Sequence, residues 1–372
     1  MKSFTNLRNL YGTLTNDNST TNLTVGDQLI NDSYRRTVAE RDWPFVQKTA
    51  TSVTMKTLAY DAQTGNFTLG LTITGGTSGA TAVIVKDTDS GTTGTLTLKT
   101  ISGTFSDNEI ITDTSTGSAT VNGTLTSVQF YDLPFDYDEL ISTNITVGTQ
   151  IFTSRECPTR KYWDQLNSVT SWTSDYPEWF FIFNGQIGFY PTPSSADNTI
   201  TFVYDRLIAD LSMADYTTGN VSAVTNGSQL VTGSGTSWTT PMAGRWIKIT
   251  PTDTAGSTGD GFWYQILSVT STTALILSKP YQGSTISGNT AYTIGQMGIL
   301  PEAYEDIPVY EAAATYFMSI KPEPARYQMF YQIYDRLHKG LIADYSMKTI
   351  DPKIEDGDDY NFINPNLFIY GS

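Results

Sequence analysis

The chain has 372 residues, a length that predicts two or three domains. Its formal net charge of −15 argues against a protein that wraps DNA or RNA, because such proteins need a surface of lysine and arginine. Aromatic residues make up 12% of the composition, which is typical of a folded chain. The single cysteine, Cys157, and the single histidine, His338, exclude an intrachain disulfide and a zinc site of the Cys/His type.

Residues 1–11 hold no apolar core of the kind that a signal peptide needs. No stretch reaches the roughly 18 consecutive apolar residues of a membrane-spanning helix. We therefore expect neither a secretion signal nor a membrane span.

The N-terminal part predicts one helix. It is expected to begin at Thr24, with Asp27 as a weak capping-box partner, and to end before Trp43-Pro44, because the residue before a proline avoids the α region. Between these points apolar residues recur at helical spacing, namely Leu29, Ile30, Tyr34 and Val38.

The C-terminal part predicts two helices. Asp306 can cap the first, which has Pro308 in its first turn and runs to about Ile320. A short connector around Pro322 and Pro324 precedes the second helix. Its apolar stripe consists of Phe330, Ile333, Tyr334, Leu337, Leu341 and Tyr345. The short connection predicts an antiparallel helical hairpin, and the three helices from both chain ends can pack as one bundle.

Two segments between these helices read as all-β. Residues 58–127 are rich in Gly and Thr, with alternation in 95–98 and 109–112, and predict a small barrel or sandwich. Residues 217–297 form the second, with turns at Asn226-Gly227 and Asp260-Gly261. The two modules share no residue pattern, so we infer no duplication.

Residues 128–216 are mixed. Two aromatic-rich runs, 179–183 and 186–190, flank Asn184-Gly185, a pair that favours the turn of a two-residue β-hairpin. Residues 199–204 predict a further strand.

The expected fold class is α+β: a helical bundle platform from both chain ends, with two inserted all-β modules and a β-hairpin segment. The platform is expected to begin with residues 1–57 and to end with the helical hairpin at 298–349. Between them come the Gly/Thr-rich module (58–127), the mixed segment (128–216) and the second β module (217–297). An extended arm, 350–372, follows the hairpin.

No sequence motif for catalysis or cofactor binding stands out. Asp87 to Gly91 resembles a calcium loop, but its glycine comes one place early and the distal acidic position is Leu98, so we interpret it as a β-turn. Arg155 can lower the thiol pKa of Cys157, yet a structural thiol is favoured. His338 is interpreted as a boundary residue at a packing seam. We expect no enzyme activity, no cofactor and no metal.

One acidic cluster keeps a glycan-related function open. Its members are Asp132, Asp136, Asp138 and Glu139, and glycosidases use a pair of such carboxylates. Three tryptophans, Trp163, Trp172 and Trp179, can stack on sugars, although tryptophan is also an ordinary core residue. Glycan hydrolysis and glycan binding therefore stay as alternatives.

The last segment predicts a docking arm. Five acidic residues between 351 and 359 precede an apolar stretch that an unpartnered, solvated tail rarely carries. The expected docking residues are Tyr360, Phe362, Ile363, Leu367, Phe368, Ile369 and Tyr370.

Several strings resemble proteins of tailed bacteriophages. They are the helix 30–36 that leads to Arg41-Asp42-Trp43-Pro44-Phe45, the segments 131–134, 181–185 and 188–193, the turn 226–228 with 231–233, Ile294-Gly295-Gln296 and Leu300-Pro301-Glu302. Together they resemble a head–tail connector, the neck adaptor that lies under the portal. The chain departs from the simplest adaptors, which are small helical proteins, by its two β modules.

This resemblance implies a structural virion protein, made in the bacterial cytoplasm and located in the neck. It implies a homo-oligomeric ring, commonly of twelve copies, that continues the DNA channel of the portal. The implied partners are the portal, a downstream tail or nozzle protein, capsid or fibre proteins and the DNA that passes through, with no membrane.

An acidic or neutral channel wall is expected, because a basic wall would bind the DNA phosphates. The channel-lining candidates are Glu302, Glu305, Asp306 and Glu311. The alternatives to an adaptor are a glycan-binding tail-fibre or baseplate component, a capsid-decoration protein and, less favoured, a glycan hydrolase. Copy number separates the first of these from an adaptor, since fibres are usually trimers.

Overall fold

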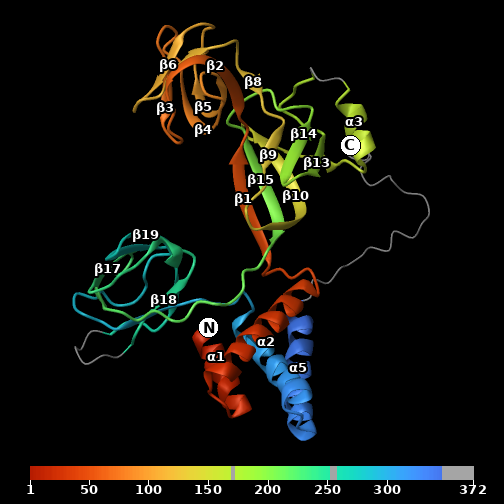
Figure 1. Cartoon of the computed structure of the whole chain (residues 1–372), viewed down its shortest axis with the longest axis vertical. Helices are drawn as coiled ribbons and strands as arrows, with labels where there is room; N and C mark the ends of the chain where they lie inside the picture. Colours follow the sequence, from red (N-terminus) through yellow and green to blue (C-terminus); the bar gives the residue numbers. More distant parts are fainter. Residues whose placement is uncertain (169–171, 252–257, 346–372) are drawn as a thin grey trace, which may run out of the picture. The chain divides into compact units, whose positions relative to one another are not determined.

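The computed structural model describes residues 1–168, 172–251 and 258–345, and it is a mixed α+β structure (Figure 1). The chain divides into two compact units. Unit 1 comprises Met1–Pro44 and Leu211–Ser372, and unit 2 comprises Phe45–Asp210. Both chain ends therefore contribute to one unit, and the other unit is a continuous internal segment.

In the described part of unit 1 there are four α-helices. They are α1 (Phe4–Thr15), α2 (Thr20–Ala39), α4 (Ile307–Thr315) and α5 (Pro324–Tyr345), with a π-helical turn, Tyr316–Ile320, between the last two. Helix α4 is apolar on most of its surface and contacts α1, α2 and α5. The helices from the two chain ends thus pack together, while their role as an assembly platform stays a prediction.

The N-terminal helices differ from the sequence prediction. Helix α1 was not predicted, although Ser3 accepts a hydrogen bond from the Asn6 amide as its N-cap and its apolar residues are buried. Helix α2 begins at Thr20 rather than Thr24, because Ser19 is the residue whose hydroxyl accepts from the Asn22 amide (3.3 Å). Asp306 precedes α4 as expected but makes no side-chain cap hydrogen bond.

Unit 1 also contains a six-stranded β segment. Its strands are β16 (Asn220–Val224), β17 (Leu230–Ser234), β18 (Trp246–Ile249), β19 (Trp263–Ser271), β20 (Ala274–Leu277) and β21 (Tyr292–Gly295), in the order β16-β17-β20-β19-β18-β21. Isolated bridges join Val221 to Thr290 and Val224 to Ile286. We call this segment the half-barrel. A 3-10 turn, Thr240–Met242, lies between β17 and β18, and a second, Glu302–Tyr304, precedes α4.

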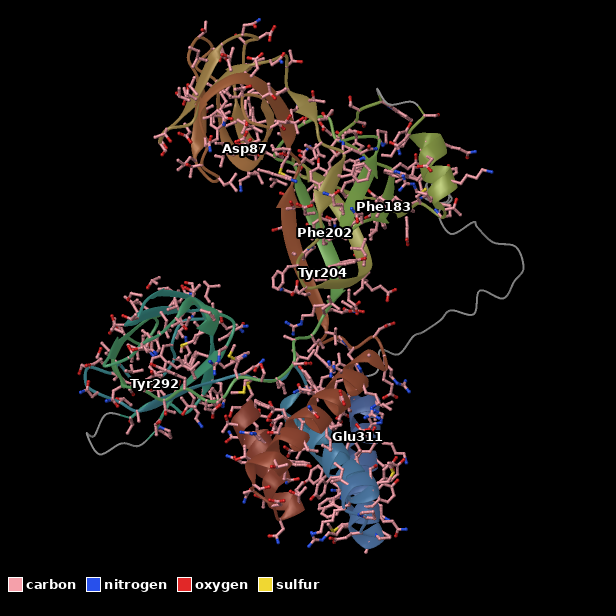
Figure 2. All side chains as sticks on the ribbon, viewed as in Figure 1. Asp87, Phe183, Phe202, Tyr204, Tyr292 and Glu311 are labelled. Atoms are coloured by element: carbon pink, nitrogen blue, oxygen red, sulfur yellow. The ribbon has the colours of Figure 1, made fainter. Side chains whose placement is uncertain are left out.

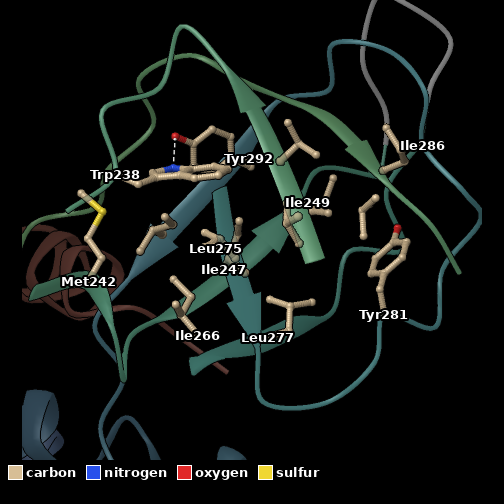
Figure 3. Packing of buried hydrophobic residues seen from close by; sticks show 14 residues of the cluster. Trp238, Met242, Ile247, Ile249, Ile266, Leu275, Leu277, Tyr281, Ile286 and Tyr292 are labelled. Carbon is tan, nitrogen blue, oxygen red and sulfur yellow. Dashed lines mark hydrogen bonds between the residues drawn. The ribbon is translucent and has the colours of Figure 1, made fainter. Parts of the chain in front are cut away.

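The half-barrel has its own hydrophobic core (Figure 3). Trp238 and Tyr292 lie at one end of it with ring centroids 5.7 Å apart. The Trp238 indole N–H donates to the Tyr292 hydroxyl (2.8 Å), which donates to the Thr218 carbonyl (2.6 Å). A three-member hydrogen-bond chain therefore satisfies the buried polar atoms of this aromatic pair.

We expect Tyr292→Phe to lower the free energy of unfolding of the half-barrel by about 2 kcal/mol, because it leaves the buried indole N–H and the Thr218 carbonyl without partners. Calorimetric unfolding measures the change. Tyr162→Phe, at an exposed tyrosine, is the matched control and should change little. If both variants had the same free energy of unfolding as the wild type, the hydrogen-bond chain would contribute nothing to stability.

Unit 2 contains a closed barrel. Its strands are β2 (Lys56–Gly65), β3 (Thr72–Gly75), β4 (Thr81–Asp89), β5 (Gly94–Ser102), β6 (Ile110–Asp113) and β7 (Ser118–Val121), followed by the short β8 (Thr126–Ser127). The order is β5-β4-β3-β6-β7-β2, and the pairing of β2 with β5 closes the ring. The sequence predicted either a small barrel or a sandwich for residues 58–127, and the structure has the barrel.

We expect that replacing Lys56–Ser127 by a short Gly/Ser linker leaves the rest of unit 2 folded. The barrel has a separate core, and the Val128 amide donates to the Met55 carbonyl (3.3 Å), so the two cut ends are already adjacent. Near- and far-ultraviolet circular dichroism and amide exchange of the remaining strands measure the outcome. Loss of protection in those strands would contradict the modular interpretation.

The remaining strands of unit 2 form two four-stranded sheets. One has the order β1-β15-β10-β11 and the other β12-β13-β14-β9. Their bounds are β1 Gln47–Val53, β9 Phe130–Asp132, β10 Tyr137–Val147, β11 Gln150–Thr153, β12 Arg155–Glu156, β13 Trp179–Phe183, β14 Gln186–Tyr190 and β15 Thr199–Arg206; the helix α3 is Arg160–Leu166. Strand β1 lies in unit 2, although residues 1–57 were expected to belong to the helical platform.

Residues from both sheets form one core, in which Phe202 and Tyr204 of β15 are fully buried (Figure 2). The predicted hairpin is confirmed. Strands β13 and β14 pair antiparallel around Asn184 and Gly185, which have φ angles of 54° and 75°. Both values are positive, as the hairpin turn requires.

Candidate functional site: carboxylates, exposed aromatics and a helical corner

The four channel-lining candidates lie on and just before α4. Glu302 is exposed, and its carboxylate contacts the α-amino group of Met1. Glu305 is 5% exposed and accepts a hydrogen bond from the Lys2 amide (2.8 Å). Burial raises the pKa of Glu305, which the nearby α-amino group partly offsets. Asp306 forms an ion pair with the Lys2 ammonium group. These three acids thus hold residues 1–2 of the chain.

The fourth candidate, Glu311, joins two helices. Its carboxylate accepts from the Ser33 hydroxyl and forms an ion pair with Arg36 (3.3 Å), both on α2 (Figure 2 labels Glu311). A channel-lining role stays a prediction for all four acids. Exposure favours that role at Glu302 and disfavours it at Glu305, whose oxygens are already enclosed.

Residues 1–5 also contact the two segments that flank the half-barrel in the chain, and the Trp263 indole N–H of β19 donates to the Met1 carbonyl (3.2 Å). The Ser3 hydroxyl donates to the Asp215 carboxylate (2.9 Å), and the Phe4 amide donates to the Gln296 carbonyl (2.8 Å). The Thr5 hydroxyl accepts from the Asp215 amide (2.9 Å). This N-terminal segment therefore connects the half-barrel to the start of α4, a function that sequence patterns alone did not indicate.

Two carboxylates of the acidic cluster near β10, Asp132 and Asp136, accept hydrogen bonds from neighbouring side chains. Asp136 accepts from the Lys48 ammonium group and from the Tyr204 hydroxyl, both at 2.7 Å. Burial by itself raises the pKa of Asp136. The two hydrogen bonds and the Lys48 charge together lower it by more than burial raises it, so the pKa lies below its usual value. Asp132 accepts from the Gln186 amide group (2.8 Å). Asp138 and Glu139 are exposed on β10.

The three candidate tryptophans have different environments. Trp163 is 2% exposed and stacks on Phe181, which makes it a core residue. Trp179 is half-buried against Tyr162. Trp172 is 56% exposed and Tyr176 is 50% exposed, so both rings are available to a ligand or partner.

The remaining candidates have structural partners. Cys157 is buried beside Trp163 and Tyr190, and burial raises the pKa of its thiol, which agrees with the favoured interpretation of a structural thiol. His338 stacks on Tyr334, and its Nε2 lies 2.6 Å from a Glu40 carboxylate oxygen. This placement agrees with the packing-seam interpretation.

The segment that resembles a calcium loop is a hairpin turn between β4 and β5. The Asp89 carboxylate accepts from the Gly91 amide (2.7 Å), and Asp87 accepts from the Tyr60 hydroxyl (2.9 Å). Among residues 1–168, 172–251 and 258–345, no three His, Cys, Asp or Glu side chains gather closely enough to hold a metal ion. The expected docking residues between Tyr360 and Tyr370 lie outside the described residues.

Four exposed apolar residues on the C-terminal helices were not predicted. They are Met318, Ile320, Met329 and Tyr331, which are between 46% and 56% exposed. Two of these residues lie on the π-helical turn and two on α5. The signal was present, since Met329 and Tyr331 fall outside the apolar stripe predicted for this helix.

Residues 108–234 match a family model described as SU10 adaptor protein. The match covers about a third of the chain, from the last strands of the barrel through both four-stranded sheets, apart from β1, and into β17. A comparison with curated proteins found no significant match. Within the described part of the chain, no helix is long and apolar enough to cross a membrane.

The family match supports a structural protein of the phage-adaptor kind. It agrees with the resemblance to tailed-phage proteins in this general form. The more specific position at the head–tail junction stays a prediction.

Proposed function

We propose that this chain is a head-to-tail adaptor of a tailed bacteriophage. Copies of it form a ring under the portal, continue the DNA channel and present a surface to the next tail component. The observation that carries the proposal is the match of residues 108–234 to the adaptor family, which supports other virion proteins as partners.

The composition supports the same role. A net charge of −15 suits a protein past which DNA slides, since few phosphate contacts form on an acidic surface. Asp136, a carboxylate with a lowered pKa, holds the neighbouring Lys48 and Tyr204 side chains. The proposed role needs no catalytic residue and no cofactor.

A reconstruction of the virion tests the proposal. We expect this chain between portal and tail, in a closed ring of about twelve copies, because heterologous contacts close when the rotation divides a circle. Trimers at the tail tip would overturn it. A mass measurement of the purified protein with and without portal gives the same discrimination in solution.

One observation favours a second candidate, a glycan-binding virion component. Trp172 and Tyr176 expose their rings in unit 2, and such rings can stack on sugars. Binding of bacterial surface polysaccharide that is lost in Trp172→Ala, together with trimeric stoichiometry, would favour this candidate over the adaptor.

A further inference from the structure

Strand β1 leaves one edge of its sheet open. It is the first strand in the order β1-β15-β10-β11, and it pairs with β15 without a bulge from Gln47 to Val53 (Figure 1). Proteins commonly block such edges with prolines, bulges, charged side chains or very short strands. Strand β1 has seven residues, no proline and one charged side chain, Lys48, which is bound to Asp136 (2.7 Å). Among the sheets of the described residues it is the longest edge strand, so it is a template for a further strand.

The backbone groups of alternate residues point out from this edge. The Thr54 amide donates to the carbonyl of Asn198, the residue that precedes β15 (2.8 Å). Residues of an antiparallel pair alternate between facing the partner strand and facing away, so the amides and carbonyls of Thr49, Thr51 and Val53 face outward. Within the described part of the chain these groups have no hydrogen-bond partner. They therefore offer donors and acceptors at the spacing of a β-strand.

A groove of about 470 Å³ adjoins the end of β1. Its apolar lining is Val53, Met55 and Val85, and Val85 lies on β4 of the closed barrel with 37% of its surface exposed. Binding grooves commonly have volumes of about 300–1,000 Å³. The groove thus has room for side chains of a segment that pairs with β1.

A hydrogen-bonded link holds the barrel wall of the groove in place. The Asp197 carboxylate accepts from the Thr100 (2.6 Å) and Ile101 (3.1 Å) amides of β5. Asp197 lies two residues before β15, the strand that pairs with β1. The link joins the barrel to the sheet that contains β1, so the groove is present before any occupant binds.

Two charged side chains line the groove. They are Lys99 on β5 and Asp132 on β9, and neither has an ion-pair partner among the residues that the structure describes. Asp132 accepts from the uncharged side-chain amide of Gln186 (2.8 Å). An occupant with one acidic and one basic side chain would complement both charges.

We propose that an extended segment of another protein adds a strand to the open edge of β1 and fills this groove. The segment carries an acidic side chain for Lys99, a basic one for Asp132 and an apolar one for Val85. A β1 strand from a second copy does not have this chemistry, because its one charged side chain is Lys48 and it offers Lys99 no carboxylate. The inference rests on the proposed function only for the source of the segment, which is another virion protein.

Amide hydrogen exchange in the purified protein and in assembled virions tests the proposal. In the purified protein the amides of Ala50 and Ser52, which face β15, should be protected, while those of Thr51 and Val53 should exchange freely. In virions the exchange at Thr51 and Val53 should slow by about a hundredfold, because the added strand accepts from these amides. Unchanged exchange at these two amides would overturn the proposal.

A proline at the edge separates strand addition from simple coverage. Thr51→Pro removes an outward amide and keeps the pairing with β15, because that amide does not face β15. In virions the protection of Val53 should then fall by about tenfold, whereas Thr51→Val, which keeps the amide, should retain it. Wild-type exchange at Ala50 and Ser52 shows that β1 is still paired in both variants. Full protection of Val53 in Thr51→Pro would contradict strand addition.

A charge reversal tests the chemistry of the occupant. Lys99→Glu should lower the protection of Val53 in virions by about tenfold, because it repels the acidic side chain of the segment. Lys161→Glu makes the same change at an exposed lysine on α3 and should have no effect. Protection at Thr51 and Val53 that appears in the purified protein and rises with its concentration would overturn the proposal, since a second copy would then be the occupant. These results leave the adaptor proposal untouched, because virion position and copy number test that proposal.

Discussion

Truncation after Thr349 is expected to leave a folded protein that no longer joins portal-containing heads. The arm carries seven expected docking residues between Tyr360 and Tyr370. Ordering it costs roughly 1–2 kcal/mol per residue in backbone entropy. Burial of its large apolar side chains recovers roughly 1.5–3 kcal/mol each. These terms nearly cancel, so stable docking depends on the further hydrogen bonds that a partner supplies, for example by strand addition.

Sedimentation of the truncated protein with purified heads measures the loss. A version that lacks only Gly371 and Ser372 is the matched control and should join heads as the full chain does. Circular dichroism shows whether both versions are folded. Undiminished assembly of the truncated protein would remove the docking role of the arm.

The second large effect is expected at Glu109, a buried carboxylate that organises the closed barrel. Its side chain is 4% exposed. One oxygen accepts from the Thr77 (3.0 Å) and Ser78 (2.8 Å) amides, and the other accepts from the Ser106 amide and the Ser78 hydroxyl, both at 2.7 Å. The carboxylate therefore holds two loops together, one at Thr77 and Ser78 and the other at Ser106.

Glu109→Ala should lower the free energy of unfolding of the barrel by roughly 3–5 kcal/mol, because three backbone amides lose their acceptor at about 1–3 kcal/mol each and solvent relieves part of that cost. Amide exchange at Thr77, Ser78 and Ser106 should accelerate by several orders of magnitude. Glu139→Gln, at an exposed acid on β10, is the control and should leave barrel exchange unchanged.

The same residue makes the barrel sensitive to acid. Burial by itself raises the pKa of Glu109. Its four hydrogen bonds together lower the pKa by more than burial raises it, so the pKa in the folded protein lies below the value of 4.5 for a free glutamate. A group with a lowered folded pKa contributes stability above its unfolded pKa, and that contribution is lost as the pH falls through the folded pKa. The wild-type barrel should therefore lose stability below about pH 4.5 more steeply than Glu109→Gln. Parallel pH profiles of the two proteins would contradict this account.

Much of the local structure followed from the sequence by itself. Asn184-Gly185 between two aromatic runs predicted the hairpin, because only a turn with positive φ angles matches the strand twist. The apolar spacing around Pro308 and Pro324 predicted the helices near residues 306–345. The unbalanced charge and the single Cys157 and His338 limited the possible chemistry. These signals act over a few residues, so sequence patterns report them.

The tertiary structure decided the rest, because the deciding partners are far apart in the chain. Closure of the barrel depends on the pairing of β2 with β5, and the edge strand β1 pairs with β15 about 150 residues later. Glu305 and Glu311 look like surface acids in the sequence, yet residues 2, 33 and 36 enclose their carboxylates. Burial and long-range hydrogen bonds determine whether a carboxylate lines a surface or joins two elements, and the spacing of neighbouring residues carries no information about either.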